Sequence, residues 1–480
     1  MSGSPPDHRG HSALSRRSLL IRLGNLSLLG MVGATVSGCS LPNPRAEVTN
    51  LYNQFVGQAQ QAAGTVPPPK VLEWITPIPP PQETLARATT GSPEWNQAMG
   101  WAQILDQWKA AHPDISLVHH VTSPADLTKT QLAAAKSGNP GDVAYTNWGR
   151  ILGKAGIVDP LNVGPLARQI VSEAFVPQTA GNQVYAFPIF LSCLGLYLNH
   201  QRFQSAKLNP EMPLRDWSTF ETAAQKLTDR TKKIYGIDVF GSGSPRSGQM
   251  RYGPFLWSAG GSFFDSAGET AIWDQPPGLD AIVYLARLSQ NYASPGAAVA
   301  PDADLINHWL TGQTATLLSG PELSIQADQK GLPYSVQSVP AYIEGQSSSL
   351  MASAGAVGIF SLSRHKDWAL GFVQYLASKN AQVAGLKYLR VLPACIEAGD
   401  AAPVFQHNPV MGQFLRILRE DDIHSFPLAA ARNTDVQAVF RVYLGIALRG
   451  LSTPEAAWHK SATEATALIK HAKATPTATP

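Results

Sequence analysis

The chain has 480 residues, 44% of them hydrophobic and 15% charged, with 40 glycines and 37 prolines. This is the composition of a globular protein long enough for two or three domains, and it excludes wholesale disorder. Residues 1–38 hold four arginines and one aspartate, so the 37 basic and 34 acidic side chains of the whole chain leave 33 of each in the rest. A neutral body of this kind argues against nucleic acid as the main partner.

The first residues have the pattern of an export signal. Arg16 and Arg17 precede an apolar, glycine-punctuated run that reaches Val36 and is followed by Ser, Gly and Cys39. The run is too short and too rich in glycine for a membrane span. Paired arginines before an apolar segment resemble a twin-arginine export signal, and small residues before a cysteine resemble the lipobox of a bacterial lipoprotein. We therefore expect 1–38 to be a signal peptide and Cys39 to be the lipidated first residue of the mature chain; an ordinary anchor helix is the alternative.

A linker is predicted between this anchor and the globular body. Residues 46–63 are rich in Gln, Asn and Ala, and the segment 64–69 that follows contains three successive prolines. Successive prolines end a helix and favour an extended spacer. Residues 39–69 are therefore predicted to form a short stalk helix and a spacer, although the first part is equally compatible with disorder.

From Lys70 onward the pattern alternates between strand and helix. Short β-favouring runs alternate with longer segments of helical periodicity, in the order 71–75, 94–112, 115–121, 125–137 and 142–145. Such alternation predicts a parallel sheet with covering helices. In open sheets of this class ligands bind at the carboxyl ends of the strands, which here are Thr76-Pro77 and residues 146–148.

An ordered set of motifs resembles the extracellular carbohydrate-binding proteins of ABC importers. They include Ala-Lys-Ser-Gly-Asn-Pro-Gly-Asp before a strand, Tyr-Ala-Phe-Pro before a crossover strand, a Pro-x-x-x-Trp helix entrance and a Trp-Ser-Ala-Gly-Gly segment. The resemblance covers 70–472, and the segments that carry it are 133–143, 184–199, 213–220, 257–265, 310–321, 368–376, 392–394 and 450–457.

The resemblance implies an α/β, two-lobed periplasmic-binding-protein-like fold. Each lobe would be a mainly parallel sheet with flanking helices, and the ligand would bind in the cleft between the lobes. The implied crossovers lie near 189–192, 339–342 and 389–393. The implied parts are a first lobe of 70–189 plus 342–389, a second lobe of 190–341 plus 390–472, and a disordered tail of 473–480.

No motif for catalysis, a metal or a cofactor stands out. The chain lacks a nucleophile elbow, a P-loop, a dinucleotide fingerprint and a zinc-protease motif. His119 and His120 are neighbours on a predicted strand and therefore point to opposite faces, which prevents joint metal ligation. Paired carboxylates of a glycosidase stay possible, because such pairs form in three dimensions. We predict no catalytic residue, no metal and no cofactor.

Sugar recognition needs flat aromatic rings and a few planar polar groups. Trp74 and Trp148 lie in or near the carboxyl ends of predicted first-lobe strands, and Trp257 lies beside the pair Gly260-Gly261. These five residues are predicted to form part of the ligand site. For each tryptophan, packing in the core is the alternative.

Polar candidates come from the same regions. Asn147 and Arg150 flank Trp148, Glu322 follows a Gly-Pro pair where relatives present a ligand-facing residue, and Arg390 precedes the last crossover. A salt bridge that closes the lobes is the alternative for Arg150, Glu322 and Arg390.

Two cysteines remain in the body, Cys193 and Cys395. Both lie near implied crossovers, so a disulfide between them is possible in an oxidising compartment, and two buried free thiols are the alternative.

The resemblance implies a monomeric substrate-binding protein, attached by lipid to the extracytoplasmic face of a bacterial membrane, that delivers a sugar to an ABC transporter permease. Two alternatives stay open: an extracytoplasmic hydrolase or transferase acting on envelope polysaccharide, and a binding protein for a glycerol-phosphate-type ligand.

Overall fold

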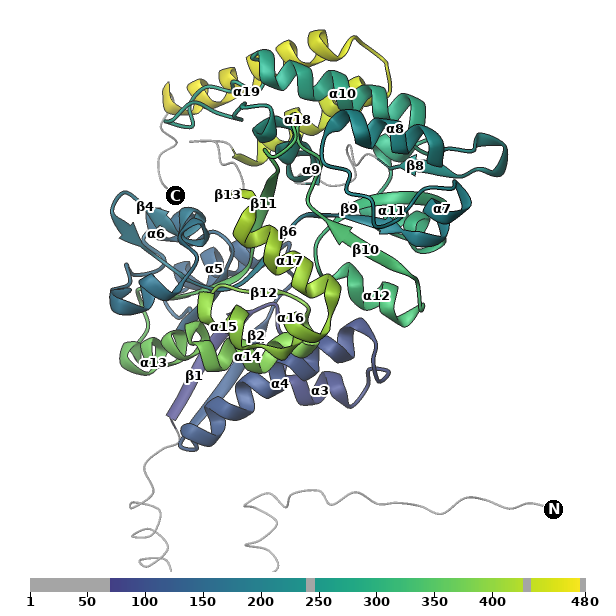
Figure 1. Cartoon of the computed structure of the whole chain (residues 1–480). Coiled ribbons are helices and arrows are strands. Elements are labelled where there is room, and N and C mark those ends of the chain that lie inside the picture. Colours follow the sequence, from purple (N-terminus) through teal and green to yellow (C-terminus); the bar gives the residue numbers. More distant parts are fainter. Residues whose placement is uncertain (1–69, 239–246, 426–432, 475–480) are drawn as a thin grey trace, which may run out of the picture. The chain divides into compact units, whose positions relative to one another are not determined.

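The computed structural model describes residues 70–238, 247–425 and 433–474 (Figure 1). The predicted signal peptide, Cys39 and the stalk therefore lie outside the described residues. Among the helices that are described, none has the length and apolar character needed to cross a membrane.

The first sheet has seven strands in the order β12-β6-β11-β3-β1-β2, with β13 paired to β11. Its strands are β1 (Lys70–Thr76), β2 (Ile115–Val121), β3 (Val143–Thr146), β6 (Phe187–Cys193), β11 (Ser348–Ile359), β12 (Leu392–Pro393) and β13 (Asp422–Ser425). The strand β1 pairs in parallel with β2 and β3, as the alternating pattern predicts. However, β11 runs antiparallel to β3 and β6, and β12 runs antiparallel to β6. The sheet is thus mixed rather than mainly parallel, because it also includes strands that cross to or from the second sheet and need no helical connection to their neighbours.

The second sheet has four strands in the order β10-β7-β9-β8. They are β7 (Gly195–Asn199), β8 (Tyr235–Ile237), β9 (Thr314–Ser319) and β10 (Tyr334–Gln337). Only Leu194 separates β6 from β7, so the chain passes directly from the first sheet to the second. It returns through residues 338–347, between β10 and β11. A separate hairpin is formed by β4 (Thr179–Ala180) and β5 (Gln183–Val184).

Helices surround both sheets (Figure 1). Those that belong by sequence to the first sheet are α3 (Pro81–Leu85), α4 (Pro93–Ala111), α5 (Leu127–Lys136), α6 (Gly149–Lys154), α13 (Lys366–Ala377) and α14 (Lys379–Leu389), with the 3-10 turns η1 (Gly164–Gln169) and η2 (Ser172–Gln178). The second sheet is accompanied by α7 (His200–Ser205), α8 (Trp217–Leu227), η3 (Arg230–Lys232), α9 (Ser247–Ser258), α10 (Pro276–Tyr292), η4 (Ala297–Val299), α11 (Asp302–Leu310) and α12 (Leu323–Gln329). The final helices are α15 (Ile396–Ala401), α16 (Pro403–His407), α17 (Pro409–Glu420), α18 (Asn433–Leu448) and α19 (Pro454–Ala474).

Local sequence explains where several of these helices begin. The Oγ of Ser92 accepts a hydrogen bond from the backbone N–H of Trp95, and Pro93 occupies the first helical position of α4. At α8, Asp216 and Thr219 form a capping box. The Pro-x-x-x-Trp motif of the sequence is therefore a helix entrance in the structure as well.

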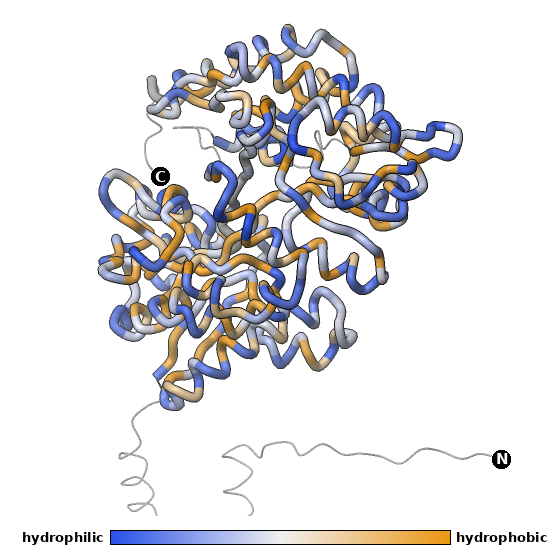
Figure 2. The backbone as a smooth tube through the Cα atoms, in the orientation of Figure 1, coloured by the Kyte–Doolittle hydropathy of each residue, from blue (hydrophilic) through white to orange (hydrophobic). Residues whose placement is uncertain are grey.

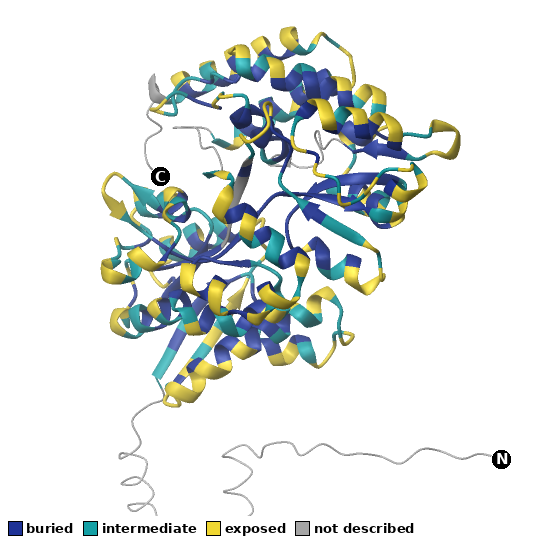
Figure 3. Cartoon of the chain, viewed as in Figure 1, coloured by how far each residue is buried: buried dark blue, intermediate teal, exposed yellow. Residues whose placement is uncertain are grey.

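Two hydrophobic cores hold the sheets and helices together. One contains the first sheet and extends to one face of the second sheet, while the other joins the opposite face of the second sheet to α8, α9, α10, α18 and α19. Figure 2 shows hydrophobic segments concentrated in the central strands, and Figure 3 shows that those strands are buried while the outer faces of the helices are exposed. Burial of apolar area, at roughly 25 cal/mol per Å², is the main force that stabilises both cores.

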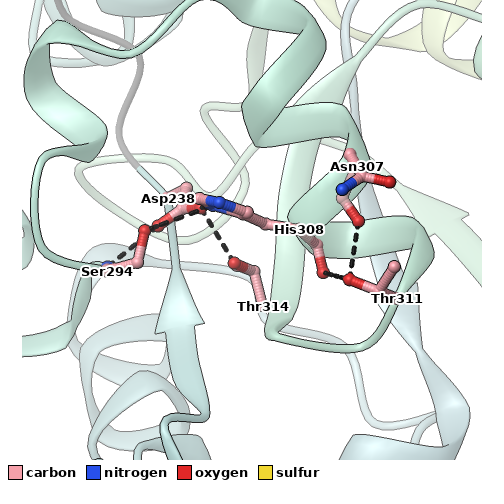
Figure 4. Close-up of polar contacts among 6 residues, drawn as sticks. All are labelled: Asp238, Ser294, Asn307, His308, Thr311 and Thr314. Carbon is pink, nitrogen blue, oxygen red and sulfur yellow. Dashed lines mark hydrogen bonds and ion pairs between the residues drawn. The ribbon is translucent and has the colours of Figure 1, made fainter.

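A buried carboxylate connects four segments of the second lobe (Figure 4). One oxygen of Asp238, directly after β8, accepts hydrogen bonds from the backbone N–H and the hydroxyl of Ser294, at 2.9 and 2.6 Å. The other oxygen accepts hydrogen bonds from His308 Nδ1 on α11, at 2.8 Å, and from the hydroxyl of Thr314 on β9, at 2.9 Å. Because Asp238 and Ser294 both contact the same histidine nitrogen, the cluster is not arranged as a catalytic triad, in which the base uses its two nitrogens separately.

A partly buried carboxylate lies beside the return crossover. Asp421, at the end of α17, accepts a hydrogen bond from the hydroxyl of Ser338 at 2.9 Å, and its second oxygen is buried with no partner among the described residues. Burial raises the pKa of Asp421 to about 6, with the hydrogen bond from Ser338 acting in the opposite direction. An ionised Asp421 therefore destabilises the folded state.

We predict that Asp421→Asn raises the free energy of unfolding at pH 7.5 and has little effect at pH 3.5. The folded-state pKa lies above the unfolded value of about 3.9. Stability is therefore greatest below about pH 4, where Asp421 is protonated in both states, and falls as pH rises from about 4 to about 6. A pKa difference of about two units corresponds to at most about 3 kcal/mol of stability. Partial exposure of the side chain reduces the expected gain in the free energy of unfolding to about 1–2 kcal/mol. Urea unfolding of the parent and of the Asp421→Asn protein at the two pH values measures this gain. Asp106→Asn, at an exposed position of α4, is the matched control, and an Asp421→Asn protein with the parent's pH dependence would contradict the prediction.

Candidate functional site

Two cavities lie between the lobes. Each is lined by residues at or after strand ends of the first sheet and by residues of the second lobe. We name the first the Trp257 cavity; it has a volume of about 460 Å³ and is lined by Arg150 and Lys154 of α6, by Trp257 at the end of α9, by the loop 262–268 and by residues 423–425 of β13. Its lining combines apolar rings with side chains of both charges.

The second cavity, named here the Glu322 cavity, has a volume of about 420 Å³. Its first-lobe wall comes from the segment after β1, from α4, and from Tyr145 and Phe190 of the sheet. Its second-lobe wall comes from Glu322, Ile325 and Gln326 at the start of α12. This cavity therefore lies between the lobes, at the carboxyl ends of β1 and β3, where the strand pattern predicts a ligand.

The end of β3 connects the two cavities. Tyr145 lines the Glu322 cavity and Arg150 lines the Trp257 cavity, and only four residues separate them in the chain. Two of those four are Asn147 and Trp148. Both cavities are thus built around the same strand end.

Trp74 lies in the core and not in the cleft. Its side chain is fully buried and is surrounded by the rings of Trp101, His119, Tyr145 and Phe372, at centroid distances of 5.3 to 6.3 Å. Side chains two apart on a strand share a face, and Leu72, two residues earlier, is also fully buried. In this structure Trp74 has no surface with which to stack on a ligand, so the packing alternative describes it.

Trp148 spans the two lobes. It follows a strand of the first sheet, yet its partly buried side chain packs against the second hydrophobic core. Its backbone N–H donates to the hydroxyl of Thr146 at 2.9 Å, which fixes the turn before α6. The neighbouring Asn147 has its amide oxygen buried without a partner among the described residues. The turn therefore places one aromatic ring and one unused acceptor between the lobes.

Trp257 lines its cavity but shares its ring face with a histidine. The rings of Trp257 and His424 are stacked at 4.4 Å with an angle of 7° between their planes, and Trp257 is only 9% exposed. His424 is held in turn by Asp422, at 2.9 Å. A ligand must therefore meet the edge of this pair or displace His424 from the indole.

Gly260 and Gly261 end a helix. The N–H of Gly260 bonds to the carbonyl of Trp257, the N–H of Gly261 bonds to the carbonyl of Leu256, and Gly260 has a φ of +83°. This is the Schellman arrangement, in which glycine adopts the left-handed conformation after the last helical turn. The pair positions Trp257 and the loop 262–268, and neither glycine is among the residues that line the two cavities.

Glu322 and Arg390 lie on opposite sides of the same interlobe region. Glu322 lines its cavity, and its only side-chain hydrogen bond among the described residues is a long one, 3.4 Å, from the hydroxyl of Ser192. Desolvation by the surrounding protein raises the pKa of the Glu322 carboxyl. Arg390 forms an ion pair with Asp328 of α12 at 3.0 Å, and its other terminal nitrogen, Nη1, is buried without a partner in the described part of the chain. Arg390 thus connects the end of α14 to α12.

Cys193 and Cys395 are buried free thiols, so the possible disulfide is not formed. The N–H of Ala394 bonds to the carbonyl of Ile189, which places Cys395 opposite Pro188 at the far end of β6 from Cys193. Five residues of strand at ~3.3 Å each separate the two positions by about 16 Å. A disulfide requires Cα atoms within about 7 Å.

The structure adds residues that the motifs did not indicate. His424 lies against Trp257, and Glu94, Gln97 and Tyr388 line the Glu322 cavity. Glu94 and Gln97 lie three apart in the first turns of α4, and this spacing places them on one face of the helix. The sequence pattern could therefore have indicated this pair. Among the described residues, no cluster of three or more His, Cys, Asp or Glu side chains has the arrangement of a metal site.

Solved structures of solute-binding proteins share this fold. A cyclic α-maltosyl-1,6-maltose binding protein from Arthrobacter globiformis matches with a TM-score of 0.71 and 19% identity over 84% of this chain and all of that one. An ABC transporter solute-binding protein from Thermotoga lettingae, bound with α-D-tagatose, matches with a TM-score of 0.66 and 21% identity over 83% of this chain and all of that one. The sugar-binding protein MalE from Xanthomonas citri matches with a TM-score of 0.69 and 13% identity over 84% of this chain and 98% of that one. The two-lobed fold that the motifs imply is therefore confirmed.

A family model gives the assignment on sequence grounds. No significant match is found among curated protein sequences. The model of the bacterial extracellular solute-binding proteins matches residues 93–383, which is more than half of the chain. These residues include β3 with the turn that follows it, Trp257 and Glu322, and so most of both cavities. The chain belongs to the family of bacterial extracellular solute-binding proteins.

Proposed function

We propose that this protein captures a carbohydrate in the cleft between its lobes and delivers it to an ABC transporter permease, without chemical change. The observation that carries the proposal is the lining of the Glu322 cavity, where the rings of Trp101, Tyr145, Phe190 and Tyr388 accompany the polar groups of Gln97, Glu322 and Gln326. Aromatic rings cover the apolar faces of a pyranose, and amides and carboxylates bind its hydroxyls. The three structural neighbours above are also described as sugar-binding proteins or are bound with a sugar.

The ligand contacts that we propose come from both cavities and from the turn after β3 that connects them. Asn147, Trp148 and Arg150 would contribute from the first lobe, and Trp257 and Glu322 from the second. Arg390 would act through its ion pair with Asp328, which joins α14 to α12 and favours the closed arrangement of the lobes. Closure of this kind is a hinge motion whose free energy comes from contacts that the ligand makes to both lobes at once.

A thermal-shift screen against a panel of mono- and oligosaccharides tests the proposal. A ligand present at 100 times its dissociation constant stabilises the folded state by about 2.7 kcal/mol, so a true ligand raises the melting temperature clearly. Trp257→Ala should reduce that shift, whereas Trp368→Ala, on α13 of the first lobe and away from both cavities, should not. A panel in which no carbohydrate shifts the melting temperature would contradict the proposal.

The amino-terminal segment supports a further part of the proposal, namely export and anchoring. The arginine pair, the apolar run and the small residues before Cys39 together favour a twin-arginine lipoprotein on the extracytoplasmic face of the membrane. The lipid on Cys39 would then hold the receptor close to its permease.

Replacing Cys39 by serine should release the protein from the membrane fraction, and replacing Arg16 and Arg17 by lysines should block its export. Cell fractionation followed by immunoblotting measures both effects, and Ser40→Ala, next to the lipidation position, is the control. Retention of the Cys39→Ser protein in the membrane fraction would show that lipid on Cys39 is not the anchor.

A further inference from the structure

A buried glutamine holds the turn that connects the two cavities. Gln178 is the last residue of η2, and its side chain is fully buried. Its amide oxygen accepts a hydrogen bond from the backbone N–H of Gly149 at 2.8 Å, and its amide nitrogen donates to the backbone carbonyl of Asn147 at 3.2 Å. One side chain therefore binds the backbone on both sides of Trp148. We name these two hydrogen bonds the Gln178 clamp.

The clamp is itself held in place. The backbone N–H of Tyr185 donates to the carbonyl of Gln178 at 2.9 Å, and Pro177 restricts the backbone immediately before it. Glu173, in the same 3-10 turn, lines the Trp257 cavity. The Gln178 clamp thus joins a wall of that cavity to the turn after β3.

The close approach of the amide to the turn requires glycine at position 149. A Cβ atom on Gly149 would lie 2.8 Å from the amide oxygen of Gln178 and 2.8 Å from the Cβ of Ala186. Carbon atoms in contact normally lie about 3.5–4.0 Å apart, so even alanine at this position would push the turn away from Gln178. The glycine at the start of α6 and the buried glutamine therefore act together.

The clamp fixes the groups that the turn presents between the lobes. The amide oxygen of Asn147 is buried without a partner among the described residues, and the ring of Trp148 packs against the second hydrophobic core. A buried acceptor without a partner is costly unless a donor reaches it, and a sugar hydroxyl is such a donor. Because Gln178 fixes the peptide groups on both sides of Trp148, it also fixes the direction from which this acceptor and this ring meet a ligand.

We propose that Gln178 is a positioning residue for ligand binding, whose two hydrogen bonds hold Asn147 and Trp148 in the orientation that binds a sugar. Gln178 is not among the residues that line the two cavities, so it acts through the turn and not by touching the ligand. A site that is already ordered before the ligand arrives binds more tightly, because less conformational entropy is lost on binding. The inference rests on the proposed carbohydrate function and adds a residue that preorganises its site.

Gln178→Met in the full-length chain tests the proposal, because methionine is similar in size to glutamine but cannot form both hydrogen bonds. Gln382→Met is the matched control. Gln382 is also fully buried, and its amide also binds two backbone groups, the carbonyl of Ala377 at 3.0 Å and the N–H of Cys395 at 2.8 Å. It lines neither cavity.

The two methionine variants should differ in affinity and not in stability. We expect similar decreases in melting temperature, since each variant loses two buried hydrogen bonds. In calorimetric titration with a sugar found in the screen, Gln178→Met should bind about tenfold or more weakly than the parent. Gln382→Met should bind within about threefold of the parent.

Gln178→Glu gives a pH profile that a loss of stability alone would not produce. A protonated carboxyl can accept from the N–H of Gly149 and donate to the carbonyl of Asn147, as the amide does, whereas an ionised carboxylate cannot donate. Burial raises the pKa of a carboxyl at this position. The affinity of Gln178→Glu relative to the parent should therefore be within about threefold at pH 5 and should fall by about fivefold or more at pH 9. This variant also keeps the test usable if Gln178→Met does not fold.

The possible failures are distinguishable. If Gln178→Met binds as tightly as the parent, or if the two methionine variants lose affinity to the same extent, the positioning role of Gln178 is overturned while the carbohydrate function stands. Equal relative affinities of Gln178→Glu at the two pH values would also contradict the positioning role. If no carbohydrate binds to the parent protein, the proposed function and the inference are both overturned.

Discussion

Replacing Trp74 by alanine should lower the free energy of unfolding by about 3–5 kcal/mol, the range found for large aromatic side chains removed from a packed core. The indole is fully buried among four other rings, two of which lie on α4 and α13, so its loss would leave a cavity that this rigid surrounding cannot fill. Urea unfolding of the ligand-free protein measures the effect. The folded fraction should bind ligand with an affinity within about threefold of the parent, since the ring does not reach the cleft.

Trp148→Ala is the matched comparison for this prediction. Its side chain is only partly buried and lies between the lobes, so we expect a loss of about 1 kcal/mol in stability and a loss of about tenfold or more in ligand affinity. The two tryptophans should thus show opposite patterns of stability and affinity. A Trp74→Ala protein with the parent's stability would show that the indole is not a core residue.

Replacing Asp238 by alanine should destabilise the second lobe by about 3–5 kcal/mol, because the change removes the acceptor for four hydrogen bonds in a fully buried place. The N–H of Ser294 and the hydroxyl of Thr314 would then be buried without partners. Asp304→Ala, at an exposed position of α11, is the control and should cost less than about 1 kcal/mol. Differential scanning calorimetry measures both variants, and equal melting temperatures for the two would contradict this account of the cluster.

The early part of the body shows how much of the fold follows from sequence. The segments predicted at 71–75, 94–112, 115–121 and 142–145 agree within one residue at either end with β1, α4, β2 and β3. Their agreement has a local cause, since each segment is either a short β-favouring run or a run of helical periodicity. The antiparallel entry of β11 between β3 and β6 has no such local cause, because it depends on residues more than 150 positions apart.

The candidate site was less accessible to prediction for a related reason. Trp74 was assigned to the cleft from its place near a strand end, but the first sheet is covered on both faces and the strand has no polar alternation to reveal which side chains point inward. The glycine pair was predicted as a ligand contact, whereas glycine directly after a helix is also the ordinary way for a helix to end. The stack of His424 on Trp257 joins residues 167 positions apart and left no pattern in the sequence.

The central claim is that the cleft binds a sugar and releases it unchanged. Calorimetric titration with a carbohydrate found in the screen, followed by mass spectrometry of the sugar recovered after prolonged incubation, tests it most directly. The account predicts that one sugar binds per chain and that the heat of binding falls to zero once the protein is saturated. The recovered sugar should be intact. Progressive conversion of the sugar to product would contradict the account, and it would indicate an enzyme in place of a receptor.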